Sequence, residues 1–415
     1  MLLTSLKSYN RSQFIKDVTA GIIVAIIALP LSIALALASG VGPEAGIFTA
    51  IVAGFVISAL GGSSVQIAGP TAAFATIVAG IVAKDGMDGL VIATILAGIF
   101  LVLMGLCHFG SLIKFIPFTI TTGFTSGIAV TIVIGQLKDF FGLTYPDGVK
   151  PIETTEKFRA VVENFSTINI DALIVGAVSL AVLIIAPYIF KRIPGFLIAV
   201  FIGILRFGFL PLKVSTIGNL YTISNSLPSF HLPAVSFEVV QNALPNAFTI
   251  AVLAAIESLL SCVVADGMIN GKHRSDMELV AQGAGNIASA LFGGIPATGA
   301  IARTAANIKN GGRTPIAGIV HSITLVIVLV VLMPYAGMIP MPTIAAILFI
   351  VAYNMCQWRT FIKLVKTAPK SDIIVLFASF ILTVLFDLVV AIEIGMVLAC
   401  LLFIKRMSEE THVNS

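Results

Sequence analysis

Long, nearly unbroken stretches of apolar residues dominate the chain. A transmembrane helix needs roughly 20 mostly apolar residues to cross about 30 Å of hydrocarbon. The pattern therefore predicts an all-α polytopic membrane protein with about 14 transmembrane segments, several of them short or broken. These segments are residues 18–38, 44–60, 70–82, 87–107, 116–137, 171–190, 194–209, 240–264, 277–292, 300–309, 315–333, 341–355, 372–388 and 390–404.

Two polar stretches divide the chain. Residues 138–170 carry five acidic residues and read as a loop outside the membrane. The less polar stretch from Pro211 to Glu238 lies between two halves of seven segments and is predicted to connect them. We therefore expect a first repeat in residues 1–210, a connector in residues 211–239 and a second repeat in residues 240–415.

The composition excludes several classes of protein. A soluble domain carries about 25% charged residues, whereas this chain of 415 residues has 11% charged and 58% hydrophobic residues. So few charges cannot cover the surface of a soluble protein of this size, which excludes a cytosolic enzyme, a disordered protein and a nucleic-acid binder. The chain also has no P-loop, HExxH or GxSxG motif. We expect no enzyme activity, no cofactor and no metal.

Positive charges fall unevenly on the two sides of the predicted segments. With the N-terminus inside, 16 Lys and Arg residues lie on the cytoplasmic side and seven outside, four of these seven in the long loop. Cytoplasmic loops of membrane proteins carry an excess of Lys and Arg. We therefore expect a multi-pass protein of the inner (cytoplasmic) membrane with both termini in the cytoplasm.

An internal repeat supports the division into halves. Residues 40–62 read GVGPEAGIFTAIVAGFVISALGG, and residues 271–294 read GKHRSDMELVAQGAGNIASALFGG. Each closes with Ser-Ala-Leu and a Gly-Gly pair, and each is followed by a short extended segment and a short helical stretch. Because seven segments per half is an odd number, the second copy must be inverted relative to the first.

Both copies predict a helix that begins at membrane depth, where irregular backbone is tolerated only if it is buried in protein or lines a cavity. Gly-Pro-Thr at residues 69–71 predicts the first start, with Pro70 at a first helical position, and Gly-Ala-Ile at residues 299–301 predicts the second. Free N–H groups and positive dipole ends at these starts would hold an anion in the middle of the bilayer. Aligning the Gly-Gly pairs without gaps puts Thr71 opposite Arg303.

Arg303 is the most informative charge in the sequence. An arginine in the centre of a transmembrane helix costs about 2.5–3.5 kcal/mol on insertion scales, so it is retained where it faces a ligand, a cavity or a partner. Three interpretations stay open. Arg303 belongs to the anion site, forms an ion pair with Glu257, or snorkels toward the cytoplasm.

Glu257 lies in the eighth segment, within VLAAIESLLSCVVAD. A lone carboxyl in hydrocarbon is either neutral or bound to a cation. Glu257 is therefore a candidate carrier of a coupling proton or sodium ion, and Ser261, four residues later on the same helical face, could supply an oxygen ligand. The alternative is the structural ion pair with Arg303.

Long segments in both repeats resemble a known family. Residues 255–322, AIESLLSCVVADGMINGKHRSDMELVAQGAGNIASALFGGIPATGAIARTAANIKNGGRTPIAGIVHS, are similar to the core of the second repeat in the sulfate permease family, whose animal members are the solute carrier 26 anion transporters. The first repeat agrees through IALPLSIALALASGVGPEAGIFTAIVAG and GGSSVQIAGPTAAF. The resemblance implies a core domain (segments one to four and eight to eleven) and a gate domain (segments five to seven and twelve to fourteen). It also implies a substrate such as sulfate, bicarbonate or a C4-dicarboxylate.

The resemblance implies site residues as well. In the family the anion lies between the two half-helix starts, which corresponds here to Thr71, Gly299, Ala300 and Arg303, with Leu31 and Leu35 lining the pocket from the first segment. In a sodium-coupled bicarbonate member the cation ligands correspond to Glu257, Ser261, Gly299 and Ile301. Because Ile301 has no side-chain oxygen, one sodium ligand is missing, which favours proton coupling.

We therefore expect a secondary active transporter of small anions, a proton-coupled symporter with elevator-like alternating access. The alternatives are a sodium-coupled symporter, an anion exchanger, a nucleobase permease of the same architecture, and a scaffold or sensor that transports nothing. The expected partners are a small inorganic or organic anion and membrane lipid, and the resemblance allows a homodimer. Family members usually continue into a cytoplasmic STAS domain, and we expect this domain to be absent because the chain stops at Ser415.

Overall fold

The computed structural model describes residues 1–2, 5, 9–111, 118–146, 151–189, 195–209, 213–233, 237–385, 394 and 397. The fold is helical, and within the described residues eight helices are long and apolar enough to cross a membrane. Two shorter apolar helices accompany them. The predicted segment 390–404 lies outside the described residues, apart from two isolated positions.

The helices follow the predicted segments closely. The first half contains α2 (Arg11–Ala38), α3 (Pro43–Leu60), α4 (Ala72–Leu106), α5 (Phe118–Phe141), α6 (Thr154–Glu163), α7 (Ile170–Ile189) and α8 (Gly195–Phe209). A short helix, α9 (Ile217–Leu220), lies in the connector. The second half contains α10 (Phe237–Ile269), α11 (Ser275–Leu291), α12 (Ile301–Lys309), α13 (Pro315–Ala336), α14 (Met341–Cys356), α15 (Trp358–Thr367) and α16 (Lys370–Leu385).

Segments three and four of the sequence form one kinked helix, α4. Gly86 breaks its helical geometry with φ 72° and ψ −170°. Glycine occupies positive φ without the steric cost that a Cβ would bring, so Gly86 allows the sharp kink between the two parts of α4. Two further helices, α6 and α15, lie in polar stretches between predicted segments.

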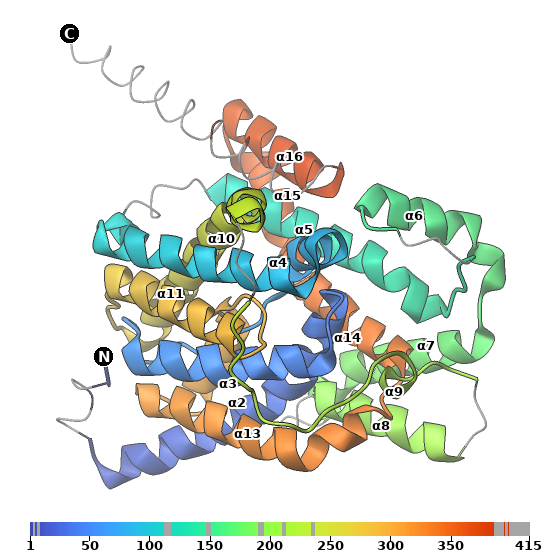
Figure 1. The fold of residues 1–415 in the computed structure, drawn as a ribbon, viewed down its shortest axis with the longest axis horizontal. Helices are drawn as coiled ribbons and strands as arrows, with labels where there is room; N and C mark the ends of the chain where they lie inside the picture. The colour runs from blue at the N-terminus through green and yellow to red at the C-terminus, as the bar shows by residue number, and fades with distance from the viewer. Residues whose placement is uncertain are drawn as a thin grey trace.

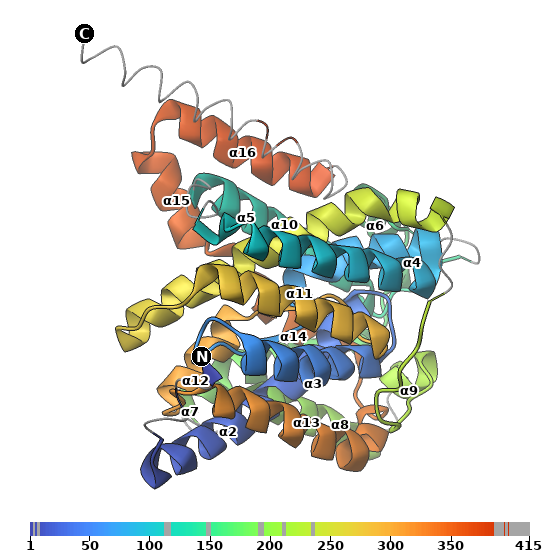
Figure 2. The same ribbon diagram turned by 60° about the vertical axis from the view of Figure 1, so that its left-hand side comes forward.

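The helices pack into two groups. One group contains α2, α3, α4, α10, α11, α12 and α13, and the other contains α5, α7, α8, α14 and α16. In both ribbon views α4, α11, α3 and α13 are stacked in that order (Figures 1 and 2). These groups are the core and gate domains that the resemblance implied.

Small residues allow the core helices to approach closely. A Cβ added to Gly98 of α4 would lie 2.7 Å from the carbonyl oxygen of Gly283, and one added to Gly283 of α11 would lie 2.5 Å from that of Gly98. Backbone contact of this kind lets membrane helices associate through van der Waals packing, since lipid offers no hydrophobic driving force between them.

Two short strands lie side by side in the interior of the core domain. β1 (Ala68–Gly69) and β2 (Thr298–Gly299) pair antiparallel, with Ala68 opposite Gly299 and Gly69 opposite Thr298. Both strands are buried, and each leads directly into a helix, α4 or α12. The pairing satisfies backbone groups that would otherwise be unbonded at membrane depth. It also brings the starts of the two half-helices together, as the inverted repeat predicted.

The register of the sequence alignment is wrong. The residues that cap the two half-helices are Thr71 and Ala300, so Thr71 corresponds to Ala300 and Arg303 lies one turn further into its helix. The position predicted for Pro70 is also wrong, because α4 begins at Ala72 and Pro70 precedes the cap. The segment after the first Gly-Gly pair is longer than the segment after the second, which a gapless alignment cannot represent.

Candidate functional site

The first half-helix begins with a hydroxyl cap. Thr71 is the N-cap of α4, in extended geometry (φ −127°, ψ 153°), and its Oγ1 accepts the backbone N–H of Ala73 at 3.5 Å. The backbone N–H of Phe74 is bonded to the carbonyl of Thr71 at 3.3 Å. Two of the otherwise unbonded N–H groups of this helix start are therefore occupied within the protein.

The second half-helix begins without a side-chain cap. Ala300 is the N-cap of α12, and its own N–H is bonded to the carbonyl of Ile67 at 3.0 Å. Among the described residues no acceptor is bonded to the N–H groups of Ile301, Ala302 or Arg303. Ile301 is 40% exposed and Ala302 is also exposed. The start of α12 thus presents free donors on an accessible face.

Glu257 of α10 lies beside the start of the first half-helix. Its carboxyl is close to the hydroxyl of Thr71. One turn earlier on α10, the carbonyl of Ala254 accepts the hydroxyl of Thr298 in β2 at 2.9 Å. The side chain of Glu257 is partly accessible in the structure, although it lies deep within α10. The carboxyl of Glu257 therefore lies beside the capped start of α4. The strand that leads into the uncapped start of α12 is bonded to the same helix, α10, one turn earlier.

Arg303 points away from the accessible face and into the core. The residue is 1% exposed, and its Nη2 donates to the carbonyl of Pro70 (3.2 Å) and to Ser32 Oγ (3.4 Å). The guanidinium lies over Gly69, where any Cβ would collide with Nη1. Among the described residues Arg303 forms no ion pair with Glu257, and its Nε and Nη1 have no hydrogen-bond partner.

The remaining predicted site residues are distributed differently. Ser261 is 0% exposed and donates to Thr304 Oγ1 at 3.4 Å, so it is bonded to α12 and not to Glu257. Leu31 is partly exposed, while Leu35 is 2% exposed and belongs to the hydrophobic core. Within the described part of the chain no group of three or more His, Cys, Asp or Glu residues could hold a metal ion.

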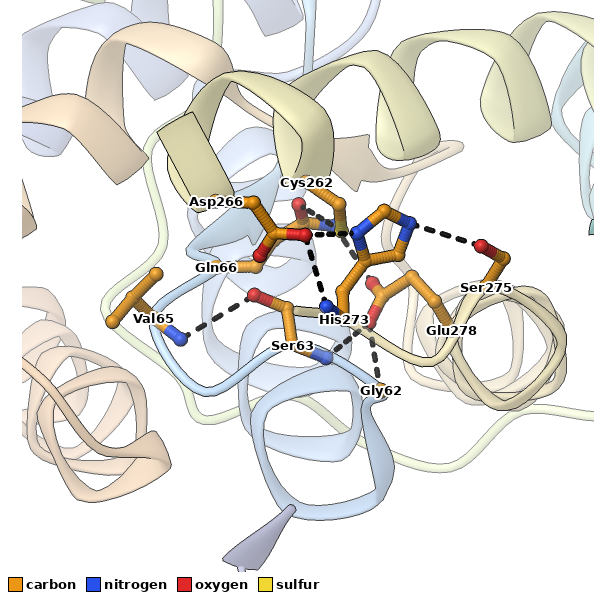
Figure 3. A network of polar contacts seen from close by, with 9 residues as sticks. All are labelled: Gly62, Ser63, Val65, Gln66, Cys262, Asp266, His273, Ser275 and Glu278. Carbon is orange, nitrogen blue, oxygen red and sulfur yellow. Dashed lines mark hydrogen bonds and ion pairs between the residues drawn. The ribbon is translucent and has the colours of Figure 1, made fainter. Parts of the chain in front are cut away.

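A buried carboxylate beside the site was not predicted. Glu278 of α11 is 0% exposed, and its Oε2 accepts the backbone N–H groups of Gly62 (2.9 Å) and Ser63 (3.1 Å). Its Oε1 accepts Gln66 Nε2 at 2.7 Å. These contacts hold the extended segment that leads from α3 to Thr71 (Figure 3).

Gln66 continues this network toward α12. Its Nε2 also donates to Ser258 Oγ at 2.8 Å, and its Oε1 accepts the thiol of Cys262 at 3.0 Å. The amide lies directly against Gly299, where a Cβ would collide with it. Gln66 therefore connects Glu278 with the strand that precedes the second half-helix. The serine it contacts is the neighbour of Glu257 in α10.

Two inverted repeats, a core and a gate group of helices, and two half-helices that start face to face define a multi-pass membrane transporter. Comparison with known proteins places it within that class. The chain belongs to the sulfate permease family, whose family model matches residues 14–379.

Relatives with assigned names match almost the whole chain. It is 42% identical to YvdB of Bacillus subtilis (strain 168), which is named provisionally as a sulfate transporter, over 99% of this chain and 77% of the relative. It is 33% identical to the bicarbonate transporter BicA of Picosynechococcus sp., over 94% of this chain and 70% of the relative.

Solved structures agree with the fold. The transmembrane domain of a cyanobacterial bicarbonate transporter BicA superposes with a TM-score of 0.82 at 30% identity, and the match covers 92% of this chain and 98% of that domain. The murine anion transporter Slc26a9 in its inward-facing state superposes with a TM-score of 0.89 at 20% identity, over 97% of this chain and 70% of that one. This second likeness concerns the fold.

Proposed function

We propose that this protein is a secondary active transporter that moves a small anion such as sulfate, bicarbonate or a C4-dicarboxylate together with a proton. The observation that carries the proposal is the meeting of the two half-helix starts beside Glu257. Membership of the sulfate permease family, with sulfate and bicarbonate transporters among the relatives, favours an anion over a nucleobase as the cargo.

The anion binds at the start of α12. Free N–H groups at a helix N-terminus and the positive end of its dipole together attract an anion, and Ile301 and Ala302 leave this start accessible. Arg303 lies one helical position beyond Ala302 with Nε and Nη1 unpartnered. It contributes positive potential from behind the site rather than a direct contact. Thr71 and Leu31 are both partly exposed, and we place them at the border of the same region, on the first half-helix and on α2.

Glu257 carries the coupling proton. A carboxyl at this depth is stable when it is protonated or paired, and the hydroxyl of Thr71 lies close to it. The hydroxyl of Ser261 is already bonded to Thr304, and Ile301 offers no oxygen. The residues around Glu257 therefore suit a proton better than a sodium ion, which needs several oxygen ligands.

Transport follows from movement of the core relative to the gate. The site lies on core helices α4, α10 and α12, so a shift of the core past the gate would carry anion and proton together from one side to the other, as in an elevator. In this scheme both termini face the cytoplasm, consistent with the excess of Lys and Arg on that side.

Uptake into proteoliposomes tests the proposal. We expect radiolabelled sulfate, bicarbonate or succinate to accumulate when the outside is more acidic than the inside, with or without sodium. Glu257→Gln mimics the protonated carboxyl, so it should still bind the anion but lose accumulation driven by the proton gradient. The control is Glu163→Gln, since Glu163 is exposed and paired with Arg159 on α6.

Three results would overturn the coupling scheme. Accumulation against a gradient by the Glu257→Gln variant would mean that another group carries the proton. A requirement for sodium at every pH would mean that the site holds a cation despite Ile301. Uptake by exchange alone, with no response to a proton gradient, would make the protein an exchanger.

A further inference from the structure

A cavity of about 540 Å³ lies away from the half-helix starts, between core helix α10 and the beginning of gate helix α5. Its walls are mostly apolar: Ile256, Leu259, Leu260 and Val263 of α10 and Phe118 of α5. The charged and most of the polar lining residues, Asp266, Lys272, His273 and Ser275, follow the apolar residues at the end of α10 and the start of α11, and Thr121 of α5 adds one hydroxyl to the wall. The cavity is therefore amphipathic along its length.

The depth of the cavity matches one leaflet of a bilayer. From Ile256 to Asp266 the wall spans ten residue steps of α10, which at 1.5 Å per step is about 15 Å, and its apolar part, from Ile256 to Val263, accounts for about 10 Å of this. The hydrocarbon core of a membrane is about 30 Å thick, so the whole wall is about as deep as one leaflet and the apolar part covers about two thirds of that depth. Its polar end coincides with the end of α10, near Ile269.

The polar end carries a free positive charge. The carboxylate of Asp266 accepts the backbone N–H (2.9 Å) and the Nδ1 (2.7 Å) of His273, and His273 Nε2 lies 3.0 Å from Ser275 Oγ (Figure 3). Asp266, the acidic side chain among the described lining residues, is thus engaged within the protein. Lys272 is exposed, and among the described residues it forms no ion pair.

We propose that this cavity binds a membrane phospholipid with an anionic headgroup, its acyl chain along α10 and its phosphate at Lys272. A slot about one leaflet deep with an apolar wall over most of its depth fits a chain of methylene groups, which a small hydrophilic anion would not fill. The lysine at the mouth is complementary to the phosphate. A lipid held here separates α10 of the core from α5 of the gate, so it lies where the two domains must slide past each other.

Quenching of tryptophan fluorescence by brominated lipid tests this site without any transport assay, so it is independent of the proposed function. Trp358 is the single tryptophan of the chain. In a Trp358→Phe background, Leu260→Trp places a reporter in the cavity wall. In phosphatidylcholine vesicles we expect brominated phosphatidylglycerol to compete for this position about fivefold better than brominated phosphatidylcholine, the preference that one lysine near a membrane surface provides.

Matched variants isolate the headgroup contact. Lys272→Gln should abolish the preference for phosphatidylglycerol at Leu260→Trp. A reporter at Ile327→Trp, on the exposed face of α13 where Ile327 is 60% exposed, should be quenched by both lipids and should not respond to Lys272→Gln. If Leu260→Trp does not fold, Val263→Trp reports on the same cavity from a more exposed position.

Three outcomes would overturn the proposal. Equal quenching by the two lipids at Leu260→Trp would mean that the cavity is ordinary lipid-facing surface. A preference that persists in Lys272→Gln would place the headgroup elsewhere. Relief of the quenching by inorganic phosphate in solution would identify the cavity as a site for a free anion.

Discussion

The two extended segments that lead to the half-helices are held by different chemistry. The first, residues 61–70, is held by the carboxylate of Glu278, which accepts two backbone N–H groups and the amide of Gln66. The second, residues 292–300, is held by neutral groups. Asn286 exchanges two hydrogen bonds of 2.8 Å with the backbone of Ala297, and Thr49 Oγ1 accepts the N–H of Ile295 at 2.7 Å.

The half-helix starts differ in the same sense. Thr71 occupies donors of α4 with its own hydroxyl and carbonyl, whereas Ala300 leaves the first turn of α12 unbonded within the described residues. The two copies of the inverted repeat therefore share a similar backbone path at the half-helix starts but differ in their side chains. One half supplies a capped, hydroxyl-bearing start that faces Glu257, and the other supplies free donors with Arg303 behind them.

Removal of Glu278 should have the largest effect. Glu278→Ala would leave several buried donors without an acceptor, and hydrogen bonds to a charged group contribute about 1.5–3 kcal/mol each. We expect a loss of at least about 3 kcal/mol, seen as a large drop in Tm or as loss of folded protein in detergent. Asn286→Ala, the matched change in the other segment, removes neutral bonds of about 0.5–1.5 kcal/mol each and should lower Tm less.

Two further variants, one at an exposed residue and one conservative, provide reference points for the drops in Tm of Glu278→Ala and Asn286→Ala. Glu163→Gln breaks the exposed pair with Arg159, which is 2.7 Å long, and exposed pairs contribute about 0–1 kcal/mol. Glu278→Gln keeps the shape of the side chain and should fall between the alanine variant and this control. Equal drops in Tm for Glu278→Ala and Asn286→Ala would show that the charge of Glu278 has no special role in holding the first segment.

Arg303 should dominate anion binding. If it supplies positive potential to the start of α12 without touching the anion, Arg303→Ala should weaken equilibrium binding of sulfate by about 2 kcal/mol, the Coulomb energy of two unit charges roughly 8 Å apart at an effective dielectric constant of about 20. This is roughly 30-fold. Arg303→Lys keeps the charge and should recover part of the affinity. The measurement is sulfate binding to purified protein, with Tm recorded in parallel.

The same variants distinguish a binding role from a structural one. Normal sulfate affinity in folded Arg303→Ala would remove Arg303 from the anion site. Loss of folded protein in both Arg303→Ala and Arg303→Lys would mean that Arg303 has a structural role, through its hydrogen bonds to Pro70 and Ser32.

Two glycine substitutions, one in each strand, should have separate effects on anion binding and on stability. A Cβ at Gly69 meets the mobile end of Arg303, whereas a Cβ at Gly299 meets the amide of Gln66 within the Glu278 network. Gly69→Ala should displace the guanidinium and weaken sulfate binding with a small change in Tm. Gly299→Ala should lower Tm more strongly, since Gln66 cannot move without breaking buried hydrogen bonds. If one of the two variants showed both the larger loss of sulfate affinity and the larger drop in Tm, binding and stability would not be separated between the two glycines.

Within the described residues, hydropathy and the internal repeat were sufficient to predict the apolar helices and the meeting of the two half-helix starts, but not α6 and α15, which lie in polar stretches. The lengths of the apolar stretches set the number of spans, and the Gly-Gly pairs marked where the chain turns back into the membrane. The register between the copies could not be predicted, because the two extended segments differ in length. That difference placed Arg303 opposite Thr71, whereas the structure places Ala300 there.

The arrangement of the site residues could not be predicted. Thr71 was predicted for the anion site and Glu257 for the coupling ion, and the structure brings the two close together. The direction of Arg303 into the core depends on Pro70 and Ser32, which lie far from it in the sequence. Glu278 was missed although a signal was present. Glu278, Gln282, Asn286 and Ser289 form a polar stripe at helical spacing within an apolar segment, and all four are 0% exposed. Such a stripe predicts a helix face that is bonded inside the protein.

Changes at the two caps should have the smallest effects. Thr71→Val keeps the shape of the side chain and removes the hydroxyl that caps α4 and faces Glu257. We expect sulfate affinity to fall by about 0.5–1.5 kcal/mol, the contribution of one neutral hydrogen bond, which is roughly two- to 13-fold. Titration of sulfate binding would measure this, and unchanged affinity would place the anion away from the start of α4.

Ala300→Ser makes the reciprocal change at the other start. A serine at this N-cap would accept an N–H of the first turn of α12, and such a cap stabilises a helix by about 0.5–2 kcal/mol. If those N–H groups bind the anion, the new oxygen competes with it and repels it. Tm should therefore rise slightly while sulfate affinity falls by a few-fold. Higher stability with unchanged affinity would mean that the donors at the start of α12 are not the ones the anion uses.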